Sequence, residues 1–360
     1  MKTNTFGCKQ SPDKIGILLA QLGTPDAPTK QALKPYLKQF LSDPRVVETN
    51  RVLWWFILNL IILQRRPARS AALYKRVWTE EGSPLLLLSQ SLSDKLQANL
   101  QQLSPSIEVT FGMRYGNPSL ESAIDQLLEA GCTKLLLFPM YPQYSAATTA
   151  STYDVVFPHL LKRRFVPTLR VAEPYYRHPA YIKALTTRIH ETLNDLESPP
   201  EKLLLSYHGV PQAYVDKGDP YCCQCSETTA ALEQTLSFPK EDIMHVYQSR
   251  FGNDPWLQPY TDDTVEELAK SGVKHIALAA PGFTADCLET IDELGVEAKE
   301  VFEEHGGEHL TLIPCLNDHP TWLEAITEIL TEELGSWLQT DTRGCQISCE
   351  IRCPSKNAQS

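Results

Sequence analysis

Short apolar segments alternate with amphipathic segments along almost the whole of this 360-residue chain. That alternation is typical of parallel β-sheets whose strands are joined by crossover helices. The chain is also longer than one hydrophobic core usually supports, so two domains are expected. The predicted fold class is therefore α/β with parallel sheets, and we expect strands at residues 14–23, 109–115, 134–140, 202–208, 244–249, 275–280 and 310–315.

The two halves of the chain share a plan. Gly23-Thr24-Pro25 closes an early strand of the first half, and His208-Gly209 closes an early strand of the second. In each half a further helix ends at a glycine, Gly131 or Gly272, before the next strand begins. Two similar lobes that face a shared cleft are the simplest assembly of such halves.

The net charge of the chain limits the classes of partner that it is expected to bind. The formal net charge is -11. Nucleic acid, or broad electrostatic binding to anionic lipid, would select a basic surface, so we expect small molecules or proteins instead. Residues 1–13 are polar and lack the apolar segment of a secretory signal, so we expect a cytoplasmic protein.

One long apolar segment, residues 52–63 (VLWWFILNLIIL), is interrupted only by Asn59. Its twelve residues are too few for a bilayer, which needs about 20. The segment is therefore either a buried core helix or an interfacial one. Its tryptophans, with Arg51 before them and Arg65-Arg66 after them, suit a peripheral membrane contact.

The nonapeptide Leu203 to Pro211 (LLLSYHGVP) predicts a buried strand that ends at a histidine. Successive leucines suit a strand covered on both faces, and Gly209 followed by Pro211 ends it. Ligands of α/β sheets bind at the carboxyl ends of strands, so His208 is a candidate site residue. A structural histidine is about as common at such a position.

The segment Ala285 to Glu297 carries Glu289, Glu293 and Glu297 at intervals of four. On a helix this spacing places the three carboxylates along one face, where like charges repel one another. The ladder is either a solvated acidic face or a path for a cation. It begins just beyond a strand end, as His208 does, so we expect both to face one cleft.

Five motifs in chain order closely resemble the ferrochelatase family, which inserts ferrous iron into protoporphyrin to make haem. The motifs are FGMRYGNP (111–118), YPQYSAATTAS (141–151), SYHGVP (206–211), VYQSRFG (246–252) followed by Pro255-Trp256-Leu257, and PGFTADCLETIDEL (281–294). The resemblance covers roughly residues 13 to 335. It implies two Rossmann-like lobes with a cleft between them, at residues 1–175 (with an apolar lip at 52–63) and 176–340, followed by a cysteine-containing tail at 341–360.

The resemblance also implies roles for the residues already singled out. His208 and Glu289 match the central pair of the family, in which the histidine is assigned proton abstraction or metal binding. Glu293 and Glu297 resemble the acidic line that carries protons or metal between the site and solvent. Carboxylate and imidazole ligands suit ferrous iron, which is here a substrate.

The porphyrin would need apolar walls and a polar rim. Arg114 is a candidate partner for a propionate, because a buried arginine without a partner is costly. Four aromatic side chains are either ordinary core residues or walls against the macrocycle: Tyr115, Tyr141, Trp256 and Phe283. The expected polar rim consists of Gln143, Ser145, Gln248, Ser249 and Asp286.

Two positions depart from other branches of the family. Leu22 stands where the Gram-positive members, which act on coproporphyrin, carry a tyrosine, and this favours protoporphyrin and the Gram-negative type. Cys287 stands where animal members carry a histidine, so metal delivery here is expected to proceed without that imidazole.

Ten cysteines raise the question of a metal cluster. Cys345, Cys349 and Cys353 resemble the carboxyl-terminal ligands of a two-iron, two-sulfur cluster found in some ferrochelatases. The animal fourth ligand falls where this chain has Ser145-Ala146-Ala147, so a fourth thiolate would have to come from residues 222–225 or elsewhere. The alternative is a reduced tail without metal.

The predicted function is therefore that of a protoporphyrin ferrochelatase. The alternatives are a cobalt chelatase acting on a related tetrapyrrole and a non-catalytic tetrapyrrole carrier, which would not need the acidic ladder. Residues 52–63 are expected to allow peripheral contact with the inner membrane or to form a homodimer face.

Overall fold

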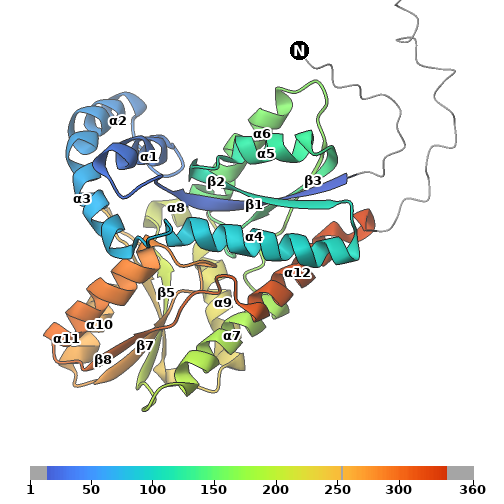
Figure 1. The fold of residues 1–360 in the computed structure, drawn as a ribbon. Coiled ribbons are helices and arrows are strands. Elements are labelled where there is room, and N and C mark those ends of the chain that lie inside the picture. The colour runs from blue at the N-terminus through green and yellow to red at the C-terminus, as the bar shows by residue number, and fades with distance from the viewer. Residues whose placement is uncertain (1–13, 253, 339–360) are drawn as a thin grey trace, which may run out of the picture.

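The computed structural model describes residues 14–252 and 254–338. This part of the chain forms two four-stranded parallel sheets with the strand orders β2-β1-β3-β4 and β6-β5-β7-β8. Helices flank both sheets (Figure 1). The second order repeats the first with every number raised by four, so the two lobes have the same topology. The predicted α/β fold of two similar lobes is confirmed.

The first sheet contains β1 (Lys14–Thr24), β2 (Ile107–Gly116), β3 (Cys132–Pro139) and β4 (Thr168–Val171). Its accompanying helices are α1 (Lys30–Ser42), α2 (Arg51–Ile57), α3 (Leu63–Val77), α4 (Pro84–Leu103), α5 (Leu120–Glu129) and α6 (Ser151–Leu161). Two short π-helices, η1 (Leu58–Ile62) and η2 (Ala146–Ala150), precede α3 and α6.

The second sheet contains β5 (Lys202–His208), β6 (Ile243–Gln248), β7 (His275–Ala279) and β8 (His309–Leu312). Its helices are α7 (Pro179–Asn194), α8 (Gln212–Asp216), α9 (Tyr221–Thr235), α10 (Thr261–Lys270), α11 (Ala298–Glu304) and α12 (Pro320–Leu334). The remaining elements are the 3-10 helices η3 (Lys240–Asp242) and η5 (Gly335–Trp337) and the π-helix η4 (Glu289–Glu297).

All seven expected strands are present, with ends shifted by a few residues. Their apolar runs suit a parallel sheet that helices cover on both faces. The strand β4 was not expected, because it is a short edge strand whose residues are half-buried or exposed and carry little apolar signal. The expected lobe boundary at residue 175 falls between β4 and α7 and stays a prediction.

One large hydrophobic cluster spans both lobes, and each lobe also has a smaller cluster of its own. Helices α4, α7 and α12 pack together between the sheets, and their apolar residues join those of β1 and β5 in a single buried cluster. Aromatic rings cross the junction: Phe138 at the end of β3 stacks on Tyr175 at 5.0 Å, and Tyr175 contacts Trp322 of α12. Trp322 is fully buried. The lobes are therefore held by apolar packing on one side of a cleft.

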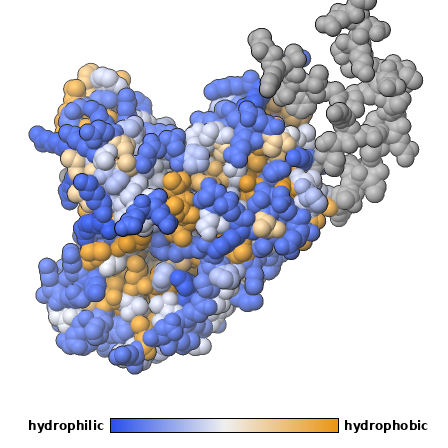
Figure 2. Space-filling view, viewed as in Figure 1, coloured by the Kyte–Doolittle hydropathy of each residue, from blue (hydrophilic) through white to orange (hydrophobic). Residues whose placement is uncertain are grey.

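Residues 51–77 form a continuous helical arm made of α2, η1 and α3. At its outer end six large apolar side chains are 51–69% exposed: Val52, Leu53, Trp55, Phe56, Leu60 and Ile61. Figure 2 shows apolar side chains at this tip of the molecule. Of the two predicted environments for residues 52–63, a buried core helix is thus wrong for most of the segment, although Leu58 and Leu63 are buried. No helix among the described residues is long and apolar enough to cross a membrane.

Candidate active site

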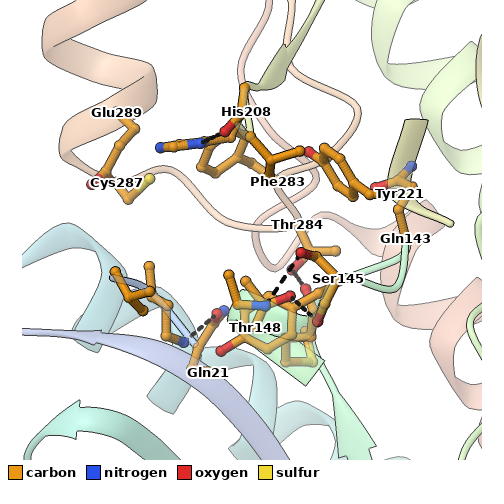
Figure 3. A pocket seen from close by; sticks show the side chains of 18 of the residues that line it. Gln21, Gln143, Ser145, Thr148, His208, Tyr221, Phe283, Thr284, Cys287 and Glu289 are labelled. Atoms are coloured by element: carbon orange, nitrogen blue, oxygen red, sulfur yellow. Dashed lines mark hydrogen bonds between the residues drawn. The ribbon is translucent and has the colours of Figure 1, made fainter. Parts of the chain in front are cut away.

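A cavity opens between the lobes at the carboxyl ends of β1 and β5. It holds about 1100 Å³ of space, part of it open to solvent, against roughly 300–1,000 Å³ for ordinary ligand pockets. Apolar and aromatic side chains form most of its wall, with a few polar groups among them (Figure 3). An apolar cavity with few convergent polar groups suits a flat, largely apolar ligand.

His208 ends β5 and lines this cavity. Its Nδ1 lies 2.7 Å from the carbonyl oxygen of Gly209, which can only accept a hydrogen bond, so Nδ1 carries the proton. In the neutral ring Nε2 is then free to accept a proton. A Cβ at Gly209 would stand 3.0 Å from the Gln248 carbonyl oxygen and 3.2 Å from Trp256, so a larger residue would fit this turn only if these neighbours shifted.

Glu289 lines the same cavity, as expected, and the ring of His208 extends towards it in Figure 3. The acidic segment is, however, a π-helix and not the α-helix that the spacing suggested. π-helices are rare and are frequently found at functional sites. The three glutamates still follow one another from the cavity towards solvent.

Glu293 lies one step further along η4. It accepts hydrogen bonds from Ser249 and, at 3.5 Å, from Gln248. Burial and the neighbouring charge of Glu289 raise the pKa of Glu293 to about 7, although the hydrogen bonds oppose this shift. Glu297 ends the series with a side chain that is 51% exposed.

Gln248 and Ser249 do not line the main cavity. Together with Glu293 and Glu297 they line a second hollow on the other side of η4. Gln248 donates a hydrogen bond of 2.7 Å to the main-chain oxygen of Glu289, which fixes the start of the π-helix. Both residues therefore contact the acidic line, and not the place where a porphyrin rim was expected.

The expected lining is reproduced at five other positions. Tyr141, Trp256 and Phe283 form parts of the wall, and Gln143 and Ser145 supply polar groups. Leu22 and Cys287, the two positions that depart from other family branches, also line the cavity. The phenol oxygen of Tyr141 and the indole nitrogen of Trp256 are buried and have no hydrogen-bonding partner within the described chain.

Arg114 and Tyr115 lie away from the cavity, contrary to expectation. Both contact Asp43, whose side chain is 1% exposed: Arg114 forms an ion pair with it, and the Tyr115 hydroxyl donates to it at 2.8 Å. Arg114 also donates to Ser151, and its guanidinium lies over the Tyr115 ring. Asp43 thus supplies Arg114 with a charged partner inside the protein, and pairing of Arg114 with a propionate stays a prediction.

Asp286 is also structural. Its carboxylate accepts hydrogen bonds from Thr290, from the Cys315 amide and, at 2.7 Å, from Asn317. These bonds tie the loop before η4 to the loop after β8. Asp286 is not among the residues that line the cavity, and its place in the porphyrin rim stays a prediction.

Some cavity residues were missed by sequence reasoning. Gln21, Thr148, Tyr221 and Thr284 line the cavity. Thr148 and Thr284 lie within motifs 141–151 and 281–294, which could have pointed to them, whereas Gln21 and Tyr221 lie outside the five motifs. Asp219 was missed as well: it accepts hydrogen bonds from Ser145 and from the Ala146 amide, and so joins the two lobes beside the cavity. Only the Pro-flanked turn at residues 218–220 could have drawn attention to it.

The described cysteines do not form a metal site. No group of three or more His, Cys, Asp or Glu residues in ranges 14–252 and 254–338 could hold a metal ion. Cys225 is buried in α9, where burial raises the pKa of its thiol well above the usual range. Cys345, Cys349 and Cys353 lie outside the described residues.

Two solved structures with a similar fold are chelatases. SirB of Bacillus subtilis, solved with Fe3+, covers 90% of this chain and 97% of its own at a TM-score of 0.52 and 13% identity. The sirohydrochlorin chelatase SirB in complex with cobalt, from the subspecies spizizenii, matches at a TM-score of 0.50 and 11% identity, over 90% of this chain and 96% of its own. The fold is that of the two-lobed α/β chelatases.

Sequence comparison is more specific. The ferrochelatase family model matches residues 14–334. A ferrochelatase of Rhodopseudomonas palustris is 48% identical over 330 residues, which are 91% of this chain and 95% of the relative. Those of Brucella ovis (90% and 93% covered) and Idiomarina loihiensis (91% and 90%) are each 47% identical. The chain belongs to the ferrochelatase family, whose members are metal-inserting enzymes of the lyase class.

Proposed function

We propose that this chain inserts ferrous iron into protoporphyrin IX, giving protohaem, with His208 and Glu289 as the central pair of the reaction. Two pyrrole N–H protons leave as the divalent iron enters, and no electron is transferred. The observation that carries the proposal is that the His208 imidazole and the Glu289 carboxylate line the same apolar cavity between the two lobes. Membership of the ferrochelatase family supports the same reaction.

His208 acts as the base in this proposal. Its Nδ1–H is held by the Gly209 carbonyl, so Nε2 accepts a pyrrole proton and the resulting imidazolium keeps its hydrogen bond. The preset tautomer means that the ring need not reorient during the reaction. In histidine generally, the hydrogen bond made by one ring nitrogen sets the protonation and the role of the other.

The acidic line carries ions between the cavity and solvent in this proposal. Glu289 faces the reaction, Glu293 is held by Ser249, and Glu297 reaches the surface. The pKa of Glu293 near 7 lets this carboxyl gain and lose a proton at physiological pH, which suits a relay. Carboxylate ligands also hold ferrous iron weakly enough to pass it on.

Anaerobic turnover of protoporphyrin with ferrous iron, followed by haem absorbance, tests the proposal. We expect His208→Ala and Glu289→Gln to lower kcat by about 100-fold or more, because general-base catalysis is worth about 10²–10⁴. Glu300→Gln, an exposed carboxylate just beyond η4, is the matched control and should keep wild-type activity. A wild-type protein that binds porphyrin but metallates it with neither iron nor cobalt would support the carrier alternative.

We further propose that the exposed end of the arm makes a peripheral contact with the inner membrane. Six exposed apolar side chains sit on one helical segment with arginines on either side, an arrangement suited to the headgroup region. The tetrapyrrole is itself apolar and partitions into membranes, so a membrane contact would shorten its path to the cavity. Burial of the same face in a homodimer is the competing outcome.

A two-iron, two-sulfur cluster on Cys345, Cys349 and Cys353 also stays a proposal, because these residues lie outside the described chain. Protein purified without oxygen should be coloured if the cluster is present, because thiolate-bound iron-sulfur clusters absorb visible light. A triple serine variant of the three cysteines should lose it. A colourless wild-type protein with free thiols would support the reduced tail instead.

A further inference from the structure

Asp292 is a buried carboxylate on the π-helix with one charged partner. Its side chain is 1% exposed, and its Oδ1 lies 2.8 Å from Nε of Arg76. Neither carboxylate oxygen makes a well-aligned hydrogen bond within the described residues, so the contact is a close charge pair. Burial raises the pKa of Asp292 and Arg76 opposes the shift. A buried carboxylate that loses its partner is costly, so the conformation of η4 depends on Arg76.

Arg76 comes from the arm, at the end opposite to the exposed apolar tip. It lies in the last turn of α3, and α3 packs against the start of η4: Tyr74 and Leu288, the residue before Glu289, belong to one apolar cluster. Arg76 also places Nη1 3.9 Å from Glu297. Within residues 14–252 and 254–338, no other ion pair involves an acidic side chain of η4.

The π-helix needs such a cation. Glu289, Asp292, Glu293 and Glu297 place four carboxyl groups on nine residues, and like charges at intervals of four destabilise a helix. A π-helix is in addition a rare conformation that persists only where its surroundings support it. Ser249 holds one side of η4 through Glu293, and Arg76 holds another through Asp292.

We propose that Arg76 is a positioning residue for metal insertion: by neutralising Asp292 it holds the π-helix so that Glu289 faces His208 and Glu293 stays on Ser249. The inference rests on the roles proposed above for these glutamates. Arg76 touches neither the cavity nor the reacting atoms, so it acts through Asp292. The arm thus carries the exposed apolar residues at one end and contacts the acidic π-helix through Arg76 at the other.

The test compares Arg76→Met, Arg76→Lys and the double variant Arg76→Met/Asp292→Asn by anaerobic iron insertion. Lys75→Met is the matched control, since Lys75 is an exposed cation on the same turn with no acidic partner among the described ion pairs. We expect Arg76→Met to lower kcat by about tenfold or more, with the KM for protoporphyrin within about twofold of wild type. Arg76→Lys and the double variant should each recover most of the activity, because one restores the charge and the other removes the need for it.

The outcomes separate this inference from the proposed function. A folded Arg76→Met with wild-type kcat overturns the inference, and so does a folded double variant as inactive as the single one. If Arg76→Met does not fold, the double variant, which buries no charge, decides: recovered activity supports the inference. A wild-type protein without iron insertion would instead contradict the proposed function.

Discussion

At the scale of single residues, Glu293 combines burial with a neighbouring charge of the same sign. The pKa of its carboxyl is raised to about 7, above its usual value of 4.5. A carboxyl of this kind stays protonated in the folded protein over a pH range in which the unfolded chain is ionised. The folded protein therefore loses stability as the pH rises and this buried carboxyl has to ionise.

This shift predicts a pH-dependent stability. Between pH 4.5 and about 7 the folded protein binds the proton that the unfolded chain has lost, so the free energy of unfolding falls as pH rises through this window. The loss should reach about 3 kcal/mol at pH 8. Glu293→Gln should abolish it, being close to wild type in urea unfolding at pH 4.5 and more stable at pH 8. If the difference in unfolding free energy between Glu293→Gln and wild type were the same at pH 4.5 and pH 8, the raised pKa would be contradicted.

Gly23 shows how a single backbone position limits the sequence. It ends β1 beside the cavity with φ 121°, and a Cβ there would stand 1.7 Å from the Tyr115 main-chain oxygen. Gly23→Ala should therefore destabilise the protein by more than about 3 kcal/mol, because a backbone clash adds to the strain of positive φ. Gly218→Ala is the control: its φ is 100° but nothing lies within 4 Å, so a cost of about 1–2 kcal/mol is expected. Urea unfolding of both variants gives the comparison, and equal costs would contradict the clash.

At the scale of elements, Asp43 joins three of them. It follows α1, pairs with Arg114 of β2, and accepts a hydrogen bond from Ser151 at the start of α6. Burial alone would raise the pKa of Asp43, but hydrogen bonds from Ser151, the Arg45 amide and Tyr115, together with the Arg114 charge, lower it. The carboxylate thus stays ionised and holds the elements together.

Arg114→Met tests this structural role against the propionate role that the sequence suggested. Removing one partner of a buried ion pair costs about 3–5 kcal/mol, so the unfolding midpoint should fall clearly. The KM for protoporphyrin should stay within about twofold of wild type in the folded variant, since Arg114 does not line the cavity. A large rise in KM with unchanged stability would restore the propionate role.

At the scale of the whole molecule, the exposed tip of the arm predicts binding to lipid. Trp55→Ser/Phe56→Ser should weaken co-sedimentation with phosphatidylglycerol-containing vesicles by about tenfold or more, because each large apolar side chain contributes about 1.5–3 kcal/mol on full burial. Leu103→Ser, an exposed apolar residue at the end of α4, is the control. Equal vesicle binding by both variants would contradict the contact. Wild-type dimerisation that the tip variant abolishes would instead assign this face to a second copy of the chain.

Much of the architecture could be read from the sequence, because strands and their ends are local features. The run Leu203 to His208 with Gly209 behind it placed the histidine at a sheet edge, and the four-residue spacing placed the glutamates in line. What local patterns did not show is the long-range partners of two predicted site residues. Arg114 looked available for a ligand because Asp43 is distant in the sequence, and Asp286 because Asn317 is.

The sequence by itself determined the two α/β lobes, the place of His208 at the end of its strand and the order of the acidic residues, since each depends on a pattern within a few residues of itself. The tertiary structure alone decided that the acidic segment winds as a π-helix, that Arg114 is bound by Asp43, and that Arg76 neutralises Asp292. Burial and pairing of charges depend on which distant segments meet, and the packing of the whole core sets those meetings.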